Sequence, residues 1–264
     1  MMSKGLLHVH SDFSYDGKNS IKELKNWGKT QGLNFIILTE HDNDFDDVKF
    51  KTYYNECVIQ SSEDLIFIPG IEYSFGSQRH IHINVFGVEE LIKTNNTLND
   101  IPRFLTDVAA KGGLSVLNHP KSVVKEIQHI DFSALFGVEL WNTKSDFLYS
   151  PDPRTNKFIK SKLTNKVIFA TSDIHKIPNS AYAAIESEEL INDTKSVIDL
   201  IKNKKFFCVF EGKTIENNFE AIQLNTLLLF LAGIHQKIYK FLRKIKRLFG
   251  LNVSPSTVRR LKLK

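Results

Sequence analysis

The chain has 264 residues, of which 42% are hydrophobic and 25% are charged, as is usual for a globular protein with a sizeable core. Its two cysteines, Cys57 and Cys208, give no disulfide framework and no metal-binding motif, which favours a reducing, cytoplasmic setting. The net charge of +5 is unevenly divided, because residues 221–264 hold ten Lys and Arg and no acidic residue, whereas residues 1–220 hold 25 basic and 30 acidic side chains.

The first predicted element is a strand that carries two histidines. Its apolar run over residues 6–10 follows Gly5 directly, so we expect no cleavable signal peptide before it. Strand periodicity would place the imidazoles of His8 and His10 on one face of the sheet. Such a pair is a candidate for metal binding, and Asp16 follows it in a turn.

Helical and strand-like segments alternate along the rest of the chain. A capping box formed by Ser20 and Glu23 predicts a helix that ends at Gly32. Helical spacing also predicts helices over residues 45–58 and 98–111. Apolar runs predict buried strands over residues 33–38, 65–71, 81–87, 114–117, 137–140 and 167–170.

Polar residues lie within five positions after the ends of most of these strands. They are His41, Glu72, His119, Asn142, Asp173 and His175. This order favours an α/β barrel of mostly parallel strands, because the C-terminal strand ends of such a barrel collect functional side chains on one rim. A doubly wound open sheet is the alternative, but it would gather ligands at one switch point.

The order and spacing of these motifs resemble the PHP family, named for polymerase and histidinol phosphatase. The resemblance covers roughly residues 5–187 and implies a distorted (β/α)7 TIM-like barrel, which we place in residues 1–220. It is carried by His8-x-His10, Tyr15-Asp16-Gly17, Thr39-Glu40-His41-Asp42, Pro69-Gly70-Ile71-Glu72, His82-Ile83, Asn118-His119-Pro120 and Ser172-Asp173-x-His175.

The resemblance also implies two or three divalent metal ions. It assigns a first ion to His8, His10, Glu72 and Asp173, a second to Glu72, His82 and His119, and a third to Asp16, His41 and His175. These nitrogen and oxygen ligands suit Zn²⁺, Mn²⁺ or Fe²⁺. His80 is an alternative to His82 as the metal ligand of this segment, and the spacing of the family motif favours His82. Asp42 is interpreted as a residue that orients an imidazole.

The activity implied by the resemblance is hydrolysis of a phosphoester in a small phosphomonoester or a nucleotide. Metal-activated hydroxide would attack phosphorus, with Glu72 as the bridging carboxylate. Asp173 or His175 would protonate the leaving alkoxide. A nuclease acting on single-stranded DNA or RNA is one alternative, and a non-catalytic binding module stabilised by its metals is another.

Substrate contacts are predicted from residues near these motifs. Arg79 and Lys121 could bind phosphate, and Lys144 and Lys176 also lie close to the site segments. Asn142 could contact substrate or form a turn, since Asn at a strand end serves either role.

Residues 221–264 form the second predicted unit, a basic amphipathic helix of about 25 residues followed by a short tail. Its apolar run over residues 227–234 is too short to cross a bilayer. The helix could pack on the barrel, bind an anionic membrane surface or contact nucleic acid. We therefore expect a cytoplasmic protein, with peripheral membrane attachment left open, and no feature of the sequence assigns an oligomeric state.

Overall fold

The computed structural model describes residues 2–146 and 150–222 and the single positions 229, 231, 233, 234 and 238. Within these residues the strands form two six-stranded sheets. The first has the order β12 (Lys213–Glu216), β11 (Phe207–Phe210), β10 (Ala184–Ser187), β1 (Ser3–Val9), β2 (Phe35–Leu38) and β4 (Ile66–Ile68). The second has the order β3 (Glu40–His41), β5 (Gly70–Phe75), β6 (Ile81–Phe86), β7 (Leu114–Leu117), β8 (Gly137–Asn142) and β9 (Val167–Thr171).

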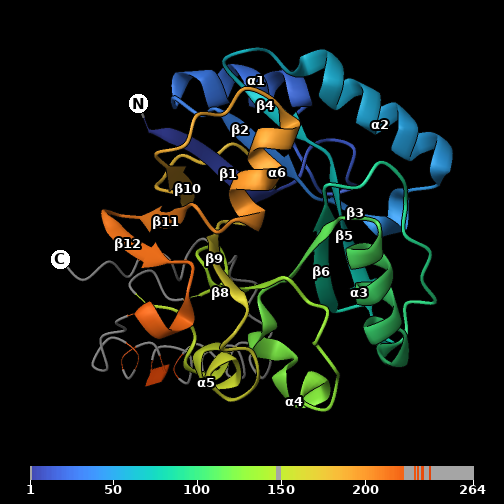
Figure 1. Cartoon of the computed structure of the whole chain (residues 1–264), viewed down its shortest axis with the longest axis vertical. Coiled ribbons are helices and arrows are strands. Elements are labelled where there is room, and N and C mark those ends of the chain that lie inside the picture. The colour runs from blue at the N-terminus through green and yellow to red at the C-terminus, as the bar shows by residue number, and fades with distance from the viewer. Residues whose placement is uncertain are drawn as a thin grey trace, which may run out of the picture.

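Helices surround the two sheets (Figure 1). They are α1 (Ile21–Thr30), α2 (Asp47–Gln60), α3 (Ile101–Ala110), α4 (Val124–Ile127), α5 (Pro153–Lys162) and α6 (Thr194–Lys202). Short 3-10 turns occupy Asp42–Asp44, Leu98–Asp100, Pro120–Ser122 and Phe219–Ala221. No helix in the described part of the chain is both long and apolar enough to cross a membrane.

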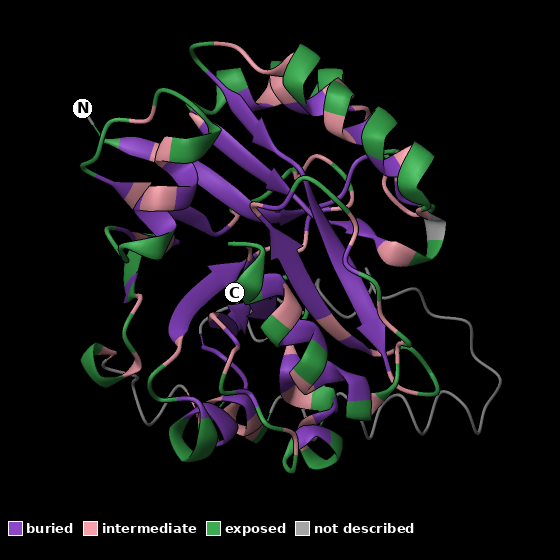
Figure 2. Cartoon of the chain, turned by 45° about the vertical axis from the view of Figure 1, so that its right-hand side comes forward, coloured by how far each residue is buried: buried purple, intermediate pink, exposed green. Residues whose placement is uncertain are grey.

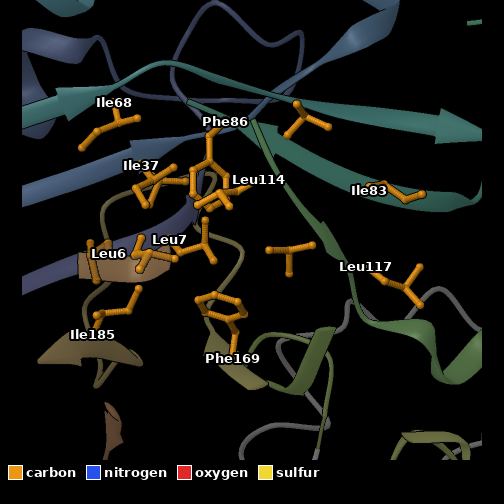
Figure 3. Close-up of a cluster of buried hydrophobic side chains, with 14 of the residues drawn as sticks. Leu6, Leu7, Ile37, Ile68, Ile83, Phe86, Leu114, Leu117, Phe169 and Ile185 are labelled. Atoms are coloured by element: carbon orange, nitrogen blue, oxygen red, sulfur yellow. The ribbon is translucent and has the colours of Figure 1, made fainter. Parts of the chain in front are cut away.

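The strands are buried on both faces, as expected for sheets covered by helices. Leu6 and Leu7, adjacent in β1, are both buried although successive side chains point to opposite faces. The core between the sheets also includes Phe86 and Phe169 (Figure 3). The helices expose mainly their outer faces (Figure 2). Because the strands are buried on both faces, the polar residues on them need a specific explanation.

The two sheets are continuous with each other through the chain. Only Thr39 separates β2 from β3, and only Pro69 separates β4 from β5. A parallel bridge between Val9 and Ile174 joins the end of β1 to the segment after β9, where the His10 N–H donates to the Ile174 carbonyl at 2.8 Å. The α/β class is confirmed, and closure into a barrel stays a prediction that this bridge supports.

The expectation of mostly parallel strands holds in part. The pairs β1–β2, β2–β4, β3–β5, β7–β8 and β8–β9 are parallel, and the remaining pairs are antiparallel. Strand β6 is antiparallel to both β5 and β7, and β10, β11 and β12 are antiparallel to their neighbours. The connection from β5 to β6 spans only residues 76–80, too short for the crossover that parallel strands require. Glu211 and Gly212 join β11 to β12 in a two-residue turn with φ of 50° and 71°, which is a hairpin connection.

The local sequence signals predicted the ends of elements better than the strand order predicted the direction of pairing. The capping box of Ser20 and Glu23 is confirmed at the start of α1. Pro69 divides the strand predicted over residues 65–71, so Glu72 lies inside β5 rather than at a strand end. The sequence analysis did not predict α5, α6 or β10 to β12. The predicted C-terminal helix lies, apart from five single positions, outside the described residues.

Candidate metal centre

The structure brings together all nine residues predicted as metal ligands. His8 and His10 come from the end of β1, Asp16 from the following loop, His41 from β3, Glu72 from β5, His82 from β6, His119 from the end of β7, and Asp173 and His175 from the loop after β9. His82 reaches the centre from the start of its strand, because β6 runs antiparallel to β5. The N-terminal end of an antiparallel strand thus lies beside the C-terminal ends of its neighbours.

The Glu72 carboxylate is the hub of this centre. Its oxygens lie 3.2 Å from His8 Nε2, 3.7 Å from His10 Nε2 and 3.1 Å from His41 Nδ1. They also lie 3.1 Å from His82 Nδ1 and 3.6 Å from His119 Nε2. The side chain of Glu72 is only 1% exposed, so five imidazoles surround one buried carboxylate.

A second group of ligands lies beside this hub. Asp16 Oδ1 lies 3.3 Å from His41 Nε2, and Asp16 Oδ2 lies 3.0 Å from His175 Nε2. Asp173 Oδ1 lies 3.5 Å from Nε2 of both His8 and His10. The donor atoms within each of four groups lie within 4.8 Å of one another: His10, Asp16, His41 and His175; His8, His10 and Glu72; His8, His119 and Asp173; and Glu72, His82 and His119.

Three of the predicted ligands have left-handed backbone conformations. The φ angle is 71° at His8, 27° at His119 and 46° at Asp173. Side-chain-bearing residues rarely adopt positive φ, and each such position costs on the order of 1–3 kcal/mol. Strained backbone of this kind concentrates at functional sites, where the surrounding structure holds it in place.

At His8 the strain comes from a β-bulge. The pairing of β1 with β2 shifts between Leu7 and Val9, so His8 has no partner of its own. The regular alternation of the strand is interrupted at His8. The imidazoles of His8 and His10 nevertheless face the same centre, as predicted, with their ring centroids 5.3 Å apart.

The charges in the centre favour cations. Burial lowers the pKa of His8, but the carboxylates of Glu139, Asp173 and Glu72 raise that pKa well above its usual value. Burial raises the pKa of Glu72, but the surrounding imidazoles, led by His8, bring it well below the usual value. Burial lowers the pKa of His10 to about 4, so its imidazole is neutral at pH 7 and able to ligate a metal.

The donor atoms fit divalent metal ions. Among the described residues, no hydrogen-bond partner is found for the buried atoms His8 Nε2, His10 Nε2, His41 Nε2, Asp16 Oδ1 and Asp173 Oδ1. Buried polar atoms are normally satisfied, and those left unsatisfied call for an ion or another ligand. Imidazole nitrogens and carboxylate oxygens without thiolates suit Zn²⁺, Mn²⁺ or Fe²⁺.

Glu139 supports the centre from behind, a role that the sequence analysis missed. Its Oε1 lies 2.6 Å from His8 Nδ1 and accepts a hydrogen bond from the Thr171 hydroxyl at 2.6 Å. Its Oε2 accepts from the His119 backbone N–H at 2.8 Å. The available signal in the sequence was an acidic residue within the apolar run Gly137-Val138-Glu139-Leu140, and the structure shows that its side chain is buried. A carboxylate on the far nitrogen of a ligating imidazole fixes the tautomer and orientation of the ring.

Glu40 supports the ligand loop in a similar way and was also missed. Its carboxylate accepts hydrogen bonds from the Ser11 backbone and hydroxyl and from the Ser14 hydroxyl. Ser14 Oγ in turn accepts from the His41 N–H at 3.0 Å. Burial raises the pKa of Glu40 to about 7, and the serine hydrogen bonds oppose this rise. Glu40 thus ties the loop after β1 to the strand of His41.

Replacing Glu139 with glutamine should weaken metal binding about 10- to 100-fold, because His8 loses its charged partner while the side-chain volume is kept. Competition against a chromophoric chelator measures the affinity. Glu63→Gln, on an exposed position, is the matched control. Equal affinities in wild type and Glu139→Gln would contradict the orienting role of Glu139.

The three residues predicted to contact substrate are engaged with side chains outside the ligand set. The Arg79 guanidinium pairs with Asp42 at 2.6 Å, and Lys121 Nζ pairs with Asp146 at 2.8 Å. Asn142 is buried and donates to Glu139, so its phosphate or substrate contact gains no support. All three substrate roles stay predictions.

Two further interpretations concern residues beside the ligands. Asp42 accepts hydrogen bonds from Arg79 and Asn96 in the described structure and not from an imidazole, so its predicted orienting role was wrong. His82 faces Glu72, whereas His80 pairs with Glu126 at 3.0 Å.

The sequence matches the family model of the PHP domain over residues 7–250. No curated protein matches it. A two-domain protein from Bacteroides vulgatus, which contains a predicted PHP-like metal-dependent phosphoesterase, is similar in structure with a TM-score of 0.54 and 18% identity. The match covers 81% of this chain and 66% of that protein, so this chain spans just under two thirds of its length. At that identity the likeness concerns the fold alone.

Two other structures are more distant. A proposed metal-dependent phosphoesterase from Bifidobacterium adolescentis has a TM-score of 0.47 and 11% identity, over 75% of this chain and 95% of its own. An amidohydrolase from Chromobacterium violaceum with bound sulfate and no metal has a TM-score of 0.48 and 14% identity. The match covers 75% of this chain and 96% of that protein. We draw nothing further from these two.

Proposed function

The chain belongs to the PHP domain family, and on that basis we propose that its histidine-rich centre is the active site of a metal-dependent phosphoester hydrolase. The observation that carries the proposal is Glu72, whose buried carboxylate lies 3.1–3.7 Å from five imidazoles. Burying so many polar groups together costs free energy unless each polar atom has a partner. Bound cations would supply the missing partners.

Two or three ions of Zn²⁺, Mn²⁺ or Fe²⁺ are the proposed cofactors. Their ligand sets are those predicted above, with His10 as an additional candidate beside Asp16, His41 and His175. When bound, the ions would supply Lewis acidity, which lowers the pKa of a water molecule and offsets the charge of a phosphoryl group. The closed seven-stranded barrel, the catalytic unit over residues 1–220 and a cytoplasmic location belong to the same proposal.

The protein's own side chains would orient the metal ligands and protonate the leaving group. Glu139 and Glu40 fix the rings and the loop that carry the ligands, so that little reorganisation is needed during the reaction. The side chains of Asp173 and His175 are partly accessible to solvent, at 12% and 17% exposed. Either could deliver a proton to the leaving-group oxygen, which is too basic to depart unassisted.

The proposed substrates are small phosphomonoesters or nucleotides. The test uses the full chain, stripped of metal and reloaded separately with Zn²⁺, Mn²⁺ or Fe²⁺, on aryl phosphate mono- and diesters, phosphorylated metabolites and short oligonucleotides. We expect metal-dependent hydrolysis of monoesters. Cleavage of oligonucleotides alone would favour the nuclease, and bound metal without turnover on any of these would favour the non-catalytic module.

A further inference from the structure

Lys144 reaches the metal centre from the loop after β8. Its Nζ lies 3.0 Å from Asp173 Oδ2 and 2.8 Å from His175 Nδ1. The preceding residue, Thr143, donates its N–H to the Thr171 carbonyl at 2.8 Å, which anchors the loop to β9. The side chain of Lys144 is 43% exposed, so the ammonium group lies between the buried ligands and solvent.

Other cations near the centre are committed to carboxylates that are not predicted ligands. Arg79 pairs with Asp42, and Lys121 pairs with Asp146, whose side chain is 4% exposed. Moving either cation toward a substrate would leave a largely enclosed carboxylate, 9% exposed at Asp42 and 4% at Asp146, without its positive partner, which is costly. The carboxylate beside Lys144 is different, because Asp173 is a predicted metal ligand and would keep a positive partner in the loaded protein.

We propose that Lys144 binds a phosphoryl oxygen of the substrate; the inference rests on the proposed function. Divalent ions held by Asp173 and His175 would repel the ammonium group and take over the charge that it now balances. The flexible four-carbon stem of lysine lets the ammonium turn toward an arriving dianion while its backbone stays anchored. An ammonium group is a common point-charge ligand for phosphate.

The experiment uses the full chain loaded with metal and inorganic phosphate as the probe. Calorimetry gives the phosphate Kd, and elemental analysis gives the metal content, for wild type, Lys144→Met and Lys144→Arg. Lys22→Met is the matched control, since Lys22 lies exposed on α1 and the substitution makes the same change in net charge.

We expect Lys144→Met to weaken phosphate binding about 10- to 100-fold, the usual loss for a hydrogen bond between charged groups. Metal content should stay at the wild-type level, and Lys144→Arg should recover part of the affinity. In turnover with an aryl phosphate, KM should rise more than kcat falls.

Two results would overturn the inference. An unchanged phosphate Kd in Lys144→Met, with wild type active, would remove Lys144 from substrate binding and leave the proposed function intact. A lower metal content in Lys144→Met would make Lys144 a residue that holds Asp173 in place. If metal-loaded wild type neither bound phosphate nor hydrolysed any phosphoester, the proposed function itself would fail.

Discussion

Replacing Glu72 with glutamine should lower kcat/KM for phosphoester hydrolysis by a factor on the order of 10³ or more and remove at least one metal ion per chain. The amide keeps the shape of the side chain but removes the one charge that five imidazoles surround at 3.1–3.7 Å. Two of the predicted ion sites share this carboxylate, so its loss affects both. Steady-state kinetics and elemental analysis of the purified variant measure the two effects.

The matched control is Glu188→Gln, on an exposed position away from the centre. It should keep both the activity and the metal content of wild type. A thermal melt of Glu72→Gln separates a lost site from a lost fold. A folded Glu72→Gln protein with full activity and full metal content would refute the assignment of Glu72.

Removal of metal should lower the melting temperature by roughly 8–16 °C relative to protein saturated with metal at about 1,000 times its Kd. A ligand that binds only the folded state contributes about 4 kcal/mol at that excess. For a domain of this size each kcal/mol shifts the melting temperature by about 2–4 °C. Scanning calorimetry with and without a chelator measures the shift.

The variant Glu72→Gln provides the internal control for this experiment, because a protein that has lost ion sites should respond less to the chelator. The same melting temperature for chelated and saturated wild-type protein would mean that the centre does not bind metal with useful affinity.

Many elements of the fold and the ligands could be predicted because their signals are local. The capping box of Ser20 and Glu23 marks the start of α1, and the apolar run Leu114–Leu117 coincides with β7. The ligands stand beside short apolar runs in a fixed order, and strand ends that meet at one edge bring such residues together. These features depend only on residues that are close together in the sequence, so the sequence alone is enough to predict them.

Features that depend on pairing could not be predicted. The bulge at His8 arises from the register between β1 and β2. The direction of β6 is likewise a property of the sheet. A one-residue shift in register moves every side chain to the other face, so strand identity alone does not place a side chain.

Supporting residues were missed for a related reason. Glu139 contacts His8, which lies 131 positions away in the sequence. Lys144 lies near the site motifs, but its contact with Asp173, 29 positions away, is visible only in the structure. Near the site motifs, Arg79 and Lys121 were as plausible as Lys144 by sequence distance. The structure separates them, because their partners Asp42 and Asp146 lie outside the ligand set.

The most direct test of the account is anomalous diffraction from crystals of the full chain grown with Mn²⁺. We predict at least two anomalous peaks within coordination distance of the cluster, one of them contacting Glu72 and one contacting Asp16, His41 or His175. Well-ordered crystals with no anomalous peak among these side chains at saturating Mn²⁺, Zn²⁺ and Fe²⁺ would contradict it.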